Sequence, residues 1–152
     1  MKIFIGADHR GFELKEKLKK ELVDYEVVDL GNSVMDESDD YPDFGALVSE
    51  KTVKNGGMGI VICGSGVGIS IAANKVNGVR CALCWKEEIA KQAREHLDAN
   101  VLALPSDFVS FEEAKIIVKT FLETKFSGEE RHLRRVEKLE SEKCCGGGCG
   151  CS

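Results

Sequence analysis

Short apolar runs alternate along the chain with longer segments in which apolar residues recur every three or four positions. The short runs are typical of β-strands, and there are five, at about residues 3–5, 27–30, 59–62, 79–83 and 101–104. The longer segments are typical of helices; Leu14, Leu18 and Leu22, for example, step by four and would share one helix face. The same periodicity predicts further helices at about 43–54, from near 69, and at 86–96, 111–122 and 128–142.

This alternation predicts an α/β fold with a helical crossover between each pair of strands. We expect a single-domain, three-layer α/β/α sandwich around a five-stranded parallel sheet, Rossmann-like in its winding, with an extra C-terminal helix. Ligands of such sheets bind at the carboxyl ends of the strands. Candidate site residues should therefore follow the strands, as do Asp8–Arg10, residues 63–68, Cys84 and the loop near His96.

Length and charge narrow the class of protein. The chain of 152 residues has the length of one domain, which we assign to residues 1–142. Residues 143–152 form a Cys- and Gly-rich tail that we expect to be flexible, since it has too little apolar content to fold alone. The formal charge of −5 argues against a nucleic-acid or anionic-membrane surface. The uncharged stretch 55–74 is rich in glycine, which favours strand, loop and helix over a membrane span.

The cysteines indicate a reducing compartment. Their number, seven, is odd, and no secretion signal is evident, so we expect free thiols and a cytoplasmic location. Cys81 and Cys84 lie three apart in a predicted strand, would face opposite sides of the sheet, and are expected in the core. No grouping in the body of the chain has zinc spacing. The tail cysteines could bind a soft metal or form an oxidation-prone terminus, in either case apart from the active site: Cys144, Cys145, Cys149 and Cys151.

A glycine loop follows the third predicted strand. Gly64, Gly66 and Gly68 would let successive backbone N–H groups point into one concavity at a helix N-terminus, where negative charge is stabilised. The spacing Gly-x-Gly-x-Gly differs from the dinucleotide fingerprint Gly-x-Gly-x-x-Gly, so a nucleotide role is only weakly indicated. Cys63 comes directly before this loop, where the thiolate form is favoured. The alternative is a buried structural cysteine.

Histidines and arginines supply further candidates. Asp8 and His9 follow the first predicted strand and form either a functional pair at the edge that holds Cys63 or a capped turn. His96 either acts in the site or complements the dipole at its helix C-terminus. Arg131 and Arg135 are one helical turn apart and would suit a phosphate dianion. A solvated face paired with neighbouring glutamates is equally compatible.

Taken together, these segments resemble the type B ribose-5-phosphate isomerase family, which also includes the galactose-6-phosphate isomerase subunits. The likeness extends from residue 1 to about residue 140, and the block at 63–75 is the most specific part. The matching segments are 6–12 (GADHRGF), 40–43 (DYPD), 63–75 (CGSGVGISIAANK), 78–80 (GVR), 98–103 (DANVLA) and 131–136 (RHLRRV).

The resemblance implies an aldose–ketose isomerase that acts on a sugar phosphate without metal or cofactor, as a homodimer or a tetramer with sites at the subunit interface. It implies that Cys63 transfers the proton between C2 and C1, and that His96, aided by Asp8, opens the sugar ring. Ser65 and the backbone from Gly64 through Gly66 and Val67 to Gly68 would hold the enediolate oxygens. The implied phosphate and substrate ligands are His9, Tyr41, Arg131 and Arg135.

Two departures from the family pattern bear on the substrate. Leu97 stands where the family usually has asparagine, and Asp107 stands where a phosphate-binding arginine is frequent, so Asp107 is expected to repel phosphate. Ribose 5-phosphate is therefore the first expectation, with another sugar phosphate, such as a hexose phosphate, as the alternative. A non-catalytic phosphosugar-binding module is a second alternative, which the joint presence of Cys63, Asp8 and His96 disfavours. A protein that handles thiols or metals is a third.

Overall fold

Strands and helices alternate along the described chain up to the fifth strand and its helix, after which one more helix follows. The structure is a computed structural model that describes residues 1–141. Its elements are β1 (Lys2–Ala7), α1 (Phe12–Glu21), β2 (Glu26–Asp29), α2 (Tyr41–Asn55), β3 (Met58–Cys63), α3 (Val67–Asn74), β4 (Cys81–Leu83), α4 (Glu87–Leu97), β5 (Val101–Pro105), α5 (Phe111–Glu123) and α6 (Glu130–Glu140).

The five strands form one parallel sheet in the order β2-β1-β3-β5-β4. The register pairs Ala7 with Ile62 and Cys63 with Pro105, so β1, β3 and β5 end side by side. This edge of the sheet, where the strands finish, is called the carboxyl edge below, and the edge where they begin is the amino edge. The predicted parallel α/β sheet with its helical crossovers is confirmed.

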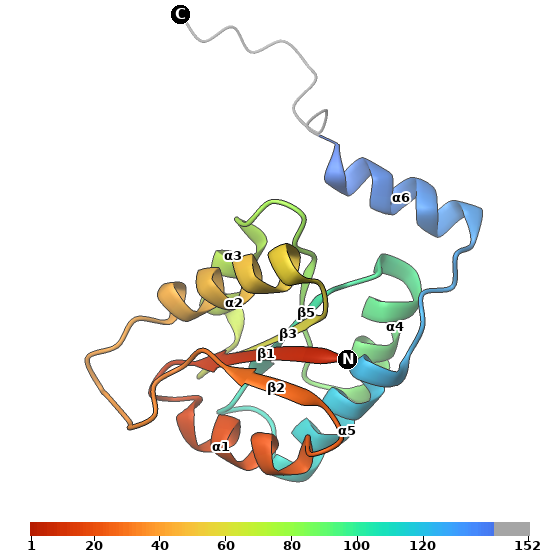
Figure 1. Cartoon of the computed structure of the whole chain (residues 1–152). Coiled ribbons are helices and arrows are strands. Elements are labelled where there is room, and N and C mark those ends of the chain that lie inside the picture. The colour runs from red at the N-terminus through yellow and green to blue at the C-terminus, as the bar shows by residue number, and fades with distance from the viewer. Residues whose placement is uncertain (142–152) are drawn as a thin grey trace, which may run out of the picture.

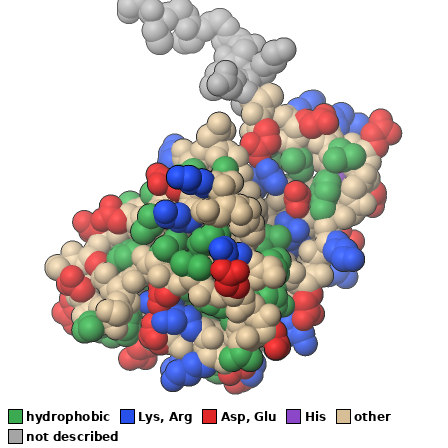
Figure 2. Space-filling view, in the orientation of Figure 1, with side chains coloured by type: hydrophobic (Ala, Val, Ile, Leu, Met, Phe, Trp, Pro, Cys, Tyr) green, Lys and Arg blue, Asp and Glu red, His purple; other side chains and the backbone are tan. Residues whose placement is uncertain are grey.

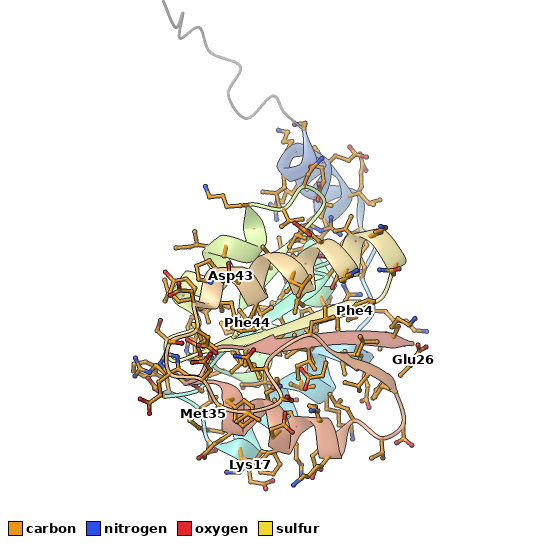
Figure 3. The ribbon with its side chains drawn as sticks, turned by 60° about the vertical axis from the view of Figure 1, so that its left-hand side comes forward. Phe4, Lys17, Glu26, Met35, Asp43 and Phe44 are labelled. Atoms are coloured by element: carbon orange, nitrogen blue, oxygen red, sulfur yellow. The ribbon has the colours of Figure 1, made fainter. Side chains whose placement is uncertain are left out.

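Two apolar cores cover the two faces of the sheet. Residues of α1, α4 and α5 pack on one face with Ile5, Ile62 and Leu104, and residues of α2 and α3 pack on the other with Val61 and Ala103. Figure 1 shows α2 and α3 on one side of the sheet and α1 and α5 on the other. Figure 3 shows Phe4 of β1 and Phe44 of α2 in the layer between strand and helix. The expected three-layer sandwich is therefore confirmed.

Cys81 and Cys84 illustrate the alternation of sides along a strand. Cys81 packs against the core under α2 and α3, whereas Cys84 lies in the opposite core, as predicted. Burial disfavours the thiolate, which raises the pKa of both thiols, that of Cys84 to about 12. Neither thiol is a nucleophile near neutral pH.

Several element boundaries differ from those expected. Helix α2 begins at Tyr41 rather than near residue 43, because Pro42 fits the first turn of a helix, where no N–H partner is needed. Helix α3 begins at Val67, directly after Gly66, rather than near residue 69. Strand β4 is confined to Cys81–Leu83. The predicted tail, apart from its position after α6, lies outside the described residues.

The last helix extends away from the body of the molecule. α6 contacts α4 near its own beginning, and Arg80 reaches its end through an ion pair with Glu140. Figures 1 and 2 show α6 at one end of the molecule, with hydrophobic and charged side chains on its surface. Leu133 and Leu139 of α6 are largely exposed. Among residues 1–141, no helix is both long and apolar enough to cross a membrane.

The core makes a direct stability prediction. Phe121 of α5 is fully buried, so Phe121→Ala should lower the free energy of unfolding by about 3–5 kcal/mol through lost burial and a residual cavity. Ile116 of the same helix is half exposed, and Ile116→Ala should change the free energy of unfolding by only about 0.5 kcal/mol. Urea titrations at one protein concentration measure both values. Equal losses would show that α5 does not pack as described.

Candidate active site

Cys63 ends β3 at the carboxyl edge, and its side chain is buried. The chain then turns through Gly64 and Ser65 to Gly66, whose positive φ of 72° allows α3 to begin at once. The Ser65 hydroxyl accepts a hydrogen bond from the Val67 N–H at 3.3 Å. The first N–H groups of α3 thus lie immediately after the thiol. This geometry agrees with the anion-binding loop expected from the sequence.

The glycines of this loop are required by close neighbours. A Cβ on Gly66 would collide with Leu83, and a Cβ on Gly68 would lie 2.6 Å from the ring of Tyr41. The Tyr41 ring therefore rests on the first turn of α3, beside the loop, although Tyr41 is remote in sequence. The structure brings Tyr41 and the loop together, as the resemblance implied.

A hollow of about 460 Å³ opens beside the loop. Its walls are largely apolar, and both Trp85 and Phe108 are well exposed there. Exposed aromatic residues beside a polar loop are typical of a binding or subunit surface. The lining residues are Ser65, Val67, Leu83, Trp85, Pro105 and Phe108.

Asp8 follows β1 at the same edge. Its N–H donates to the carbonyl of Ile62, and its carboxylate accepts the Gly11 N–H at 3.0 Å. Burial of this carboxylate raises the pKa of Asp8. Asp8 thus caps a turn, which was one of the two interpretations of its sequence, and it directly follows β1, the strand that pairs with the Cys63 strand β3.

His9 is held by an acidic loop between β2 and α2. Its backbone N–H and its ring Nδ1 both contact Oδ1 of Asp39, at 2.9 and 2.8 Å. This hydrogen bond, together with nearby carboxylates, raises the pKa of His9. Figure 3 shows Met35 of this loop and Asp43 on one side of the molecule, opposite Glu26 at the amino end of β2. The loop therefore lies at the carboxyl edge.

Asp107 is not a free negative charge. Arg10 donates through Nη2 to the Asp107 carboxylate, and the pair lies directly on Gly64, the first glycine of the loop. The Asp107 N–H also donates to the Gly64 carbonyl at 3.0 Å. The expectation that Asp107 repels phosphate is corrected on this point, because its charge is neutralised by Arg10.

A second group of candidate residues lies at the amino edge. His96 is in the last turn of α4, and the centroid of its ring lies 4.4 Å from that of His132 in α6, with the two rings tilted by 35°. His132 is buried, and its Nδ1 lies 2.6 Å from the hydroxyl of Ser127. Burial, with His96 beside it, lowers the pKa of His132, so this ring is neutral at physiological pH.

Arg131 and Arg135 extend this second group along α6. Both are exposed, and the Arg131 Nε donates to Glu129 at 2.8 Å. The pairing with a neighbouring glutamate matches one of the alternatives left open by the sequence. The spacing of one helical turn keeps both guanidinium groups on the same side of α6 as predicted. Leu97 lies nearby, exposed at the rim of a cavity of about 470 Å³ under the end of α6.

The candidate residues therefore form two separate groups in one chain. We expected the loop near His96 at the carboxyl edge, and this expectation is wrong. Helix α4 runs back along the sheet after β4, so its end lies at the amino edge. Cys63 pairs with Pro105 at the far end of β5, and the strand from Val101 to Pro105 spans about 13 Å. The resemblance implied that Asp8 assists His96 in opening the sugar ring. The same separation means that Asp8 and His96 of one chain cannot act together in this way.

Sequence reasoning missed Asp39 and Ser127 as site residues, and it missed the contacts that Arg10 and His132 make. Asp39 and Arg10 contact the predicted His9 and Asp107, and Ser127 and His132 support His96. Arg10 was a candidate only for its place after the first strand, and Asp39 lies directly before the matching segment 40–43. The sequence carries no local signal for their partners, which are 30 and 97 residues away.

Comparison with known proteins gives one consistent result. The family model described as Ribose/Galactose Isomerase matches residues 3–139. Ribose-5-phosphate isomerase B from Mycobacterium tuberculosis is 42% identical over 142 residues, which cover 91% of this chain and 88% of that protein.

Solved structures agree. Ribose-5-phosphate isomerase B from Clostridium thermocellum superposes with a TM-score of 0.90 at 46% identity, covering 97% of this chain and all of that one. The Mycoplasma genitalium protein of the same name, solved with bound ribulose-5-phosphate, gives a TM-score of 0.86 at 47% identity over 91% of this chain and 93% of that one.

The Arg10–Asp107 pair makes a prediction for anion binding. Arg10→Ala should uncover the Asp107 charge beside the loop and raise KM for a sugar phosphate about fivefold, which corresponds to roughly 1 kcal/mol of exposed Coulomb energy. Asp107→Asn is the matched control and should lower KM by a similar factor. Steady-state kinetics at low and high salt measure both effects, which should shrink as salt rises. An unchanged KM in both variants would place the pair outside the reach of substrate.

Proposed function

The chain belongs to the ribose/galactose isomerase family, and from this premise we propose that it interconverts ribose 5-phosphate and ribulose 5-phosphate. The observation that carries the proposal is Cys63 at the end of β3, directly before a loop of backbone N–H donors. An isomerase of this kind needs one base and one set of donors for a developing oxyanion, and both are adjacent here. The relatives' ribose 5-phosphate activity supports this substrate over a hexose phosphate, although Leu97 departs from the family pattern.

In the proposed reaction, the Cys63 thiolate removes the proton from C2 of the open-chain aldose. The electron pair moves into the C1–C2 bond and onto the carbonyl oxygen, which gives an enediolate. The N–H groups between Gly64 and Gly68, with the Ser65 hydroxyl, stabilise its oxygens. The proton on O2 moves to O1, and the Cys63 thiol then returns a proton to C1 as the C2 carbonyl forms, which leaves the ketose and regenerates the thiolate.

The remaining candidate residues bind substrate and prepare it. We assign ring opening to His96. Its ring can reach the furanose oxygen of a sugar bound at Cys63 only if the amino edge of one chain meets the carboxyl edge of another. His9, Arg131 and Arg135 would bind the phosphate, because a cationic imidazole and two guanidinium groups complement a dianion. Tyr41, beside Gly68, would contact the sugar. Asp8 would act on the ring-opening step from the Cys63 side.

The separation of the two groups supports a homodimer. One complete site needs Cys63 and His9 from one chain and the partner's His96 and Arg131 from the other. Both groups are bordered by exposed apolar side chains, which favours burial of each against a second copy: Val67, Trp85 and Phe108 at the carboxyl edge, and Leu97, Leu133 and Leu139 at the amino edge. A tetramer would then be a pair of such dimers.

A cytoplasmic location fits the same proposal. Phosphorylated sugars are intracellular metabolites, and the proposed base must stay a reduced thiol. Cys63, Cys81 and Cys84, the cysteines within the described residues, are all free.

Replacement of the proposed base should separate chemistry from binding. Cys63→Ala should lower kcat at least a thousandfold while the Kd for ribose 5-phosphate stays within about tenfold, since the loop and the phosphate ligands remain. Cys81→Ala is the control and should keep its activity, because burial holds that thiol protonated. NMR in D2O follows both turnover and deuterium incorporation at C2. A Cys63→Ala variant that still exchanges this proton would assign the base to another group.

Mixing two inactive variants tests the shared site. Cys63→Ala and His96→Ala should each be inactive alone, but co-refolding should restore about a quarter of wild-type activity. Random exchange makes about half of the dimers mixed, and each mixed dimer has one intact site. Refolding either variant with itself is the control. No recovery in a mixture shown to contain mixed dimers would mean that each site belongs to one chain.

A further inference from the structure

We propose that Asp39 is a positioning residue for His9, which it orients through the ring Nδ1 and keeps in the cationic form that binds the substrate phosphate. The inference rests on the proposed function in one respect, namely that the phosphate bound by His9 belongs to a sugar phosphate substrate. The contact between Asp39 and His9, and its effect on protonation, can be tested without turnover.

One carboxylate oxygen fixes His9 in two ways. Oδ1 of Asp39 accepts the backbone N–H of His9 at 2.9 Å and lies 2.8 Å from its Nδ1. The backbone bond sets where the residue lies after β1, and the ring bond sets the rotation of the imidazole. With Nδ1 engaged, Nε2 is the ring nitrogen that can donate to a ligand.

Asp39 is itself fixed by hydrogen bonds that lead back to a buried lysine. Its other oxygen, Oδ2, accepts a hydrogen bond from Asn32 Nδ2 at 3.1 Å, and the carbonyl of Asn32 accepts one from Lys15 Nζ at 2.8 Å. Lys15 is fully buried and is anchored by Asp29 at 2.8 and 3.0 Å. A chain of contacts thus runs from a buried ion pair to the site histidine. The Asp39 side chain is 8% exposed, so its geometry is well protected from solvent.

The charges that face His9 act in the same direction. Asp39 contributes most through its hydrogen bond, and Asp8 from the turn after β1 and Glu37 from the acidic loop add attraction. Asp36, in the same loop, also interacts electrostatically with His9. The pKa of His9 is therefore raised, so the ring stays protonated to a higher pH than an isolated imidazole and loses its charge only as the pH passes that value.

This arrangement resolves a conflict in the site. A neutral imidazole is a poor partner for a phosphate dianion at neutral pH, while an unpaired carboxylate nearby would repel it. Asp39 favours the imidazolium and has its own two oxygens occupied by His9 and Asn32. The outward charge offered to the ligand is then the positive one on the ring.

An NMR titration of the histidine ring protons tests the protonation directly. The chain has three histidines, so a His9→Gln variant identifies the His9 signal. In Asp39→Asn the His9 pKa should fall by about one pH unit, the size typical for loss of a carboxylate partner. Glu37→Gln is the matched control, since it removes a nearby charge but no hydrogen bond, and should move the value much less. An unmoved His9 titration in folded Asp39→Asn would overturn the proposal.

Kinetics on the full chain test the consequence. In Asp39→Asn, KM for ribose 5-phosphate should match the wild type near pH 5.5 and exceed it about tenfold near pH 8, while kcat changes by less than about threefold. Asp39→Glu retains a carboxylate and should restore part of the wild-type profile. A KM raised equally at every pH would show a merely structural role and overturn the proposal. If the wild-type chain does not isomerise ribose 5-phosphate, the proposed function fails, and weaker binding of inorganic phosphate by Asp39→Asn at pH 8 would still support the His9 inference.

Discussion

A helix that joins two parallel strands has to return along the sheet, so it ends at the edge opposite the one where the preceding strand finished. Most features of this molecule depend on that constraint. It places Cys63, the glycine loop and His9 at the carboxyl edge, and it places His96 with α6 at the amino edge. No adjustment of loops within one chain closes a gap of about 13 Å along β5. The proposed dimer is the arrangement that lets both edges contribute to one reaction.

The fold follows from the sequence because its signals are local and repeated. Apolar runs such as 59–62 and stepped leucines such as Leu14 and Leu18 specify strands and helices without knowledge of the partners. The glycine loop was predictable for the same reason, since Gly66 and Cys63 are neighbours in the chain. His96 was predicted at the wrong edge because a motif identifies a candidate residue but does not show that the residue lies at the far end of a helix, which has crossed the sheet to the opposite edge. Contacts such as Arg10 with Asp107 depend on the closed fold and leave no pattern in the chain.

Near the glycine loop, two carboxylates are each balanced by a paired basic side chain rather than by a general excess of positive charge. Asp107 is paired with Arg10, and Asp39 is paired with His9, so these two carboxylates do not face a ligand as free anions. At the other edge, His132 is buried and neutral beside His96. A neutral His132 places no positive charge beside the ring of His96. The surroundings thus shift the two histidines in opposite directions, since the pKa of His9 is raised and that of His132 is lowered.

The distance between the two groups has a further consequence for how such a protein can diverge. If each reaction centre draws one half from each of two chains, a duplicated gene need not preserve both halves. One copy could keep the thiol edge and lose the histidine edge, while the other did the reverse, and the mixed assembly would retain one working centre. A single gene duplication could therefore convert a homodimer of this design into an obligate heterodimer. Each of its two unlike subunits would then depend on the other for turnover.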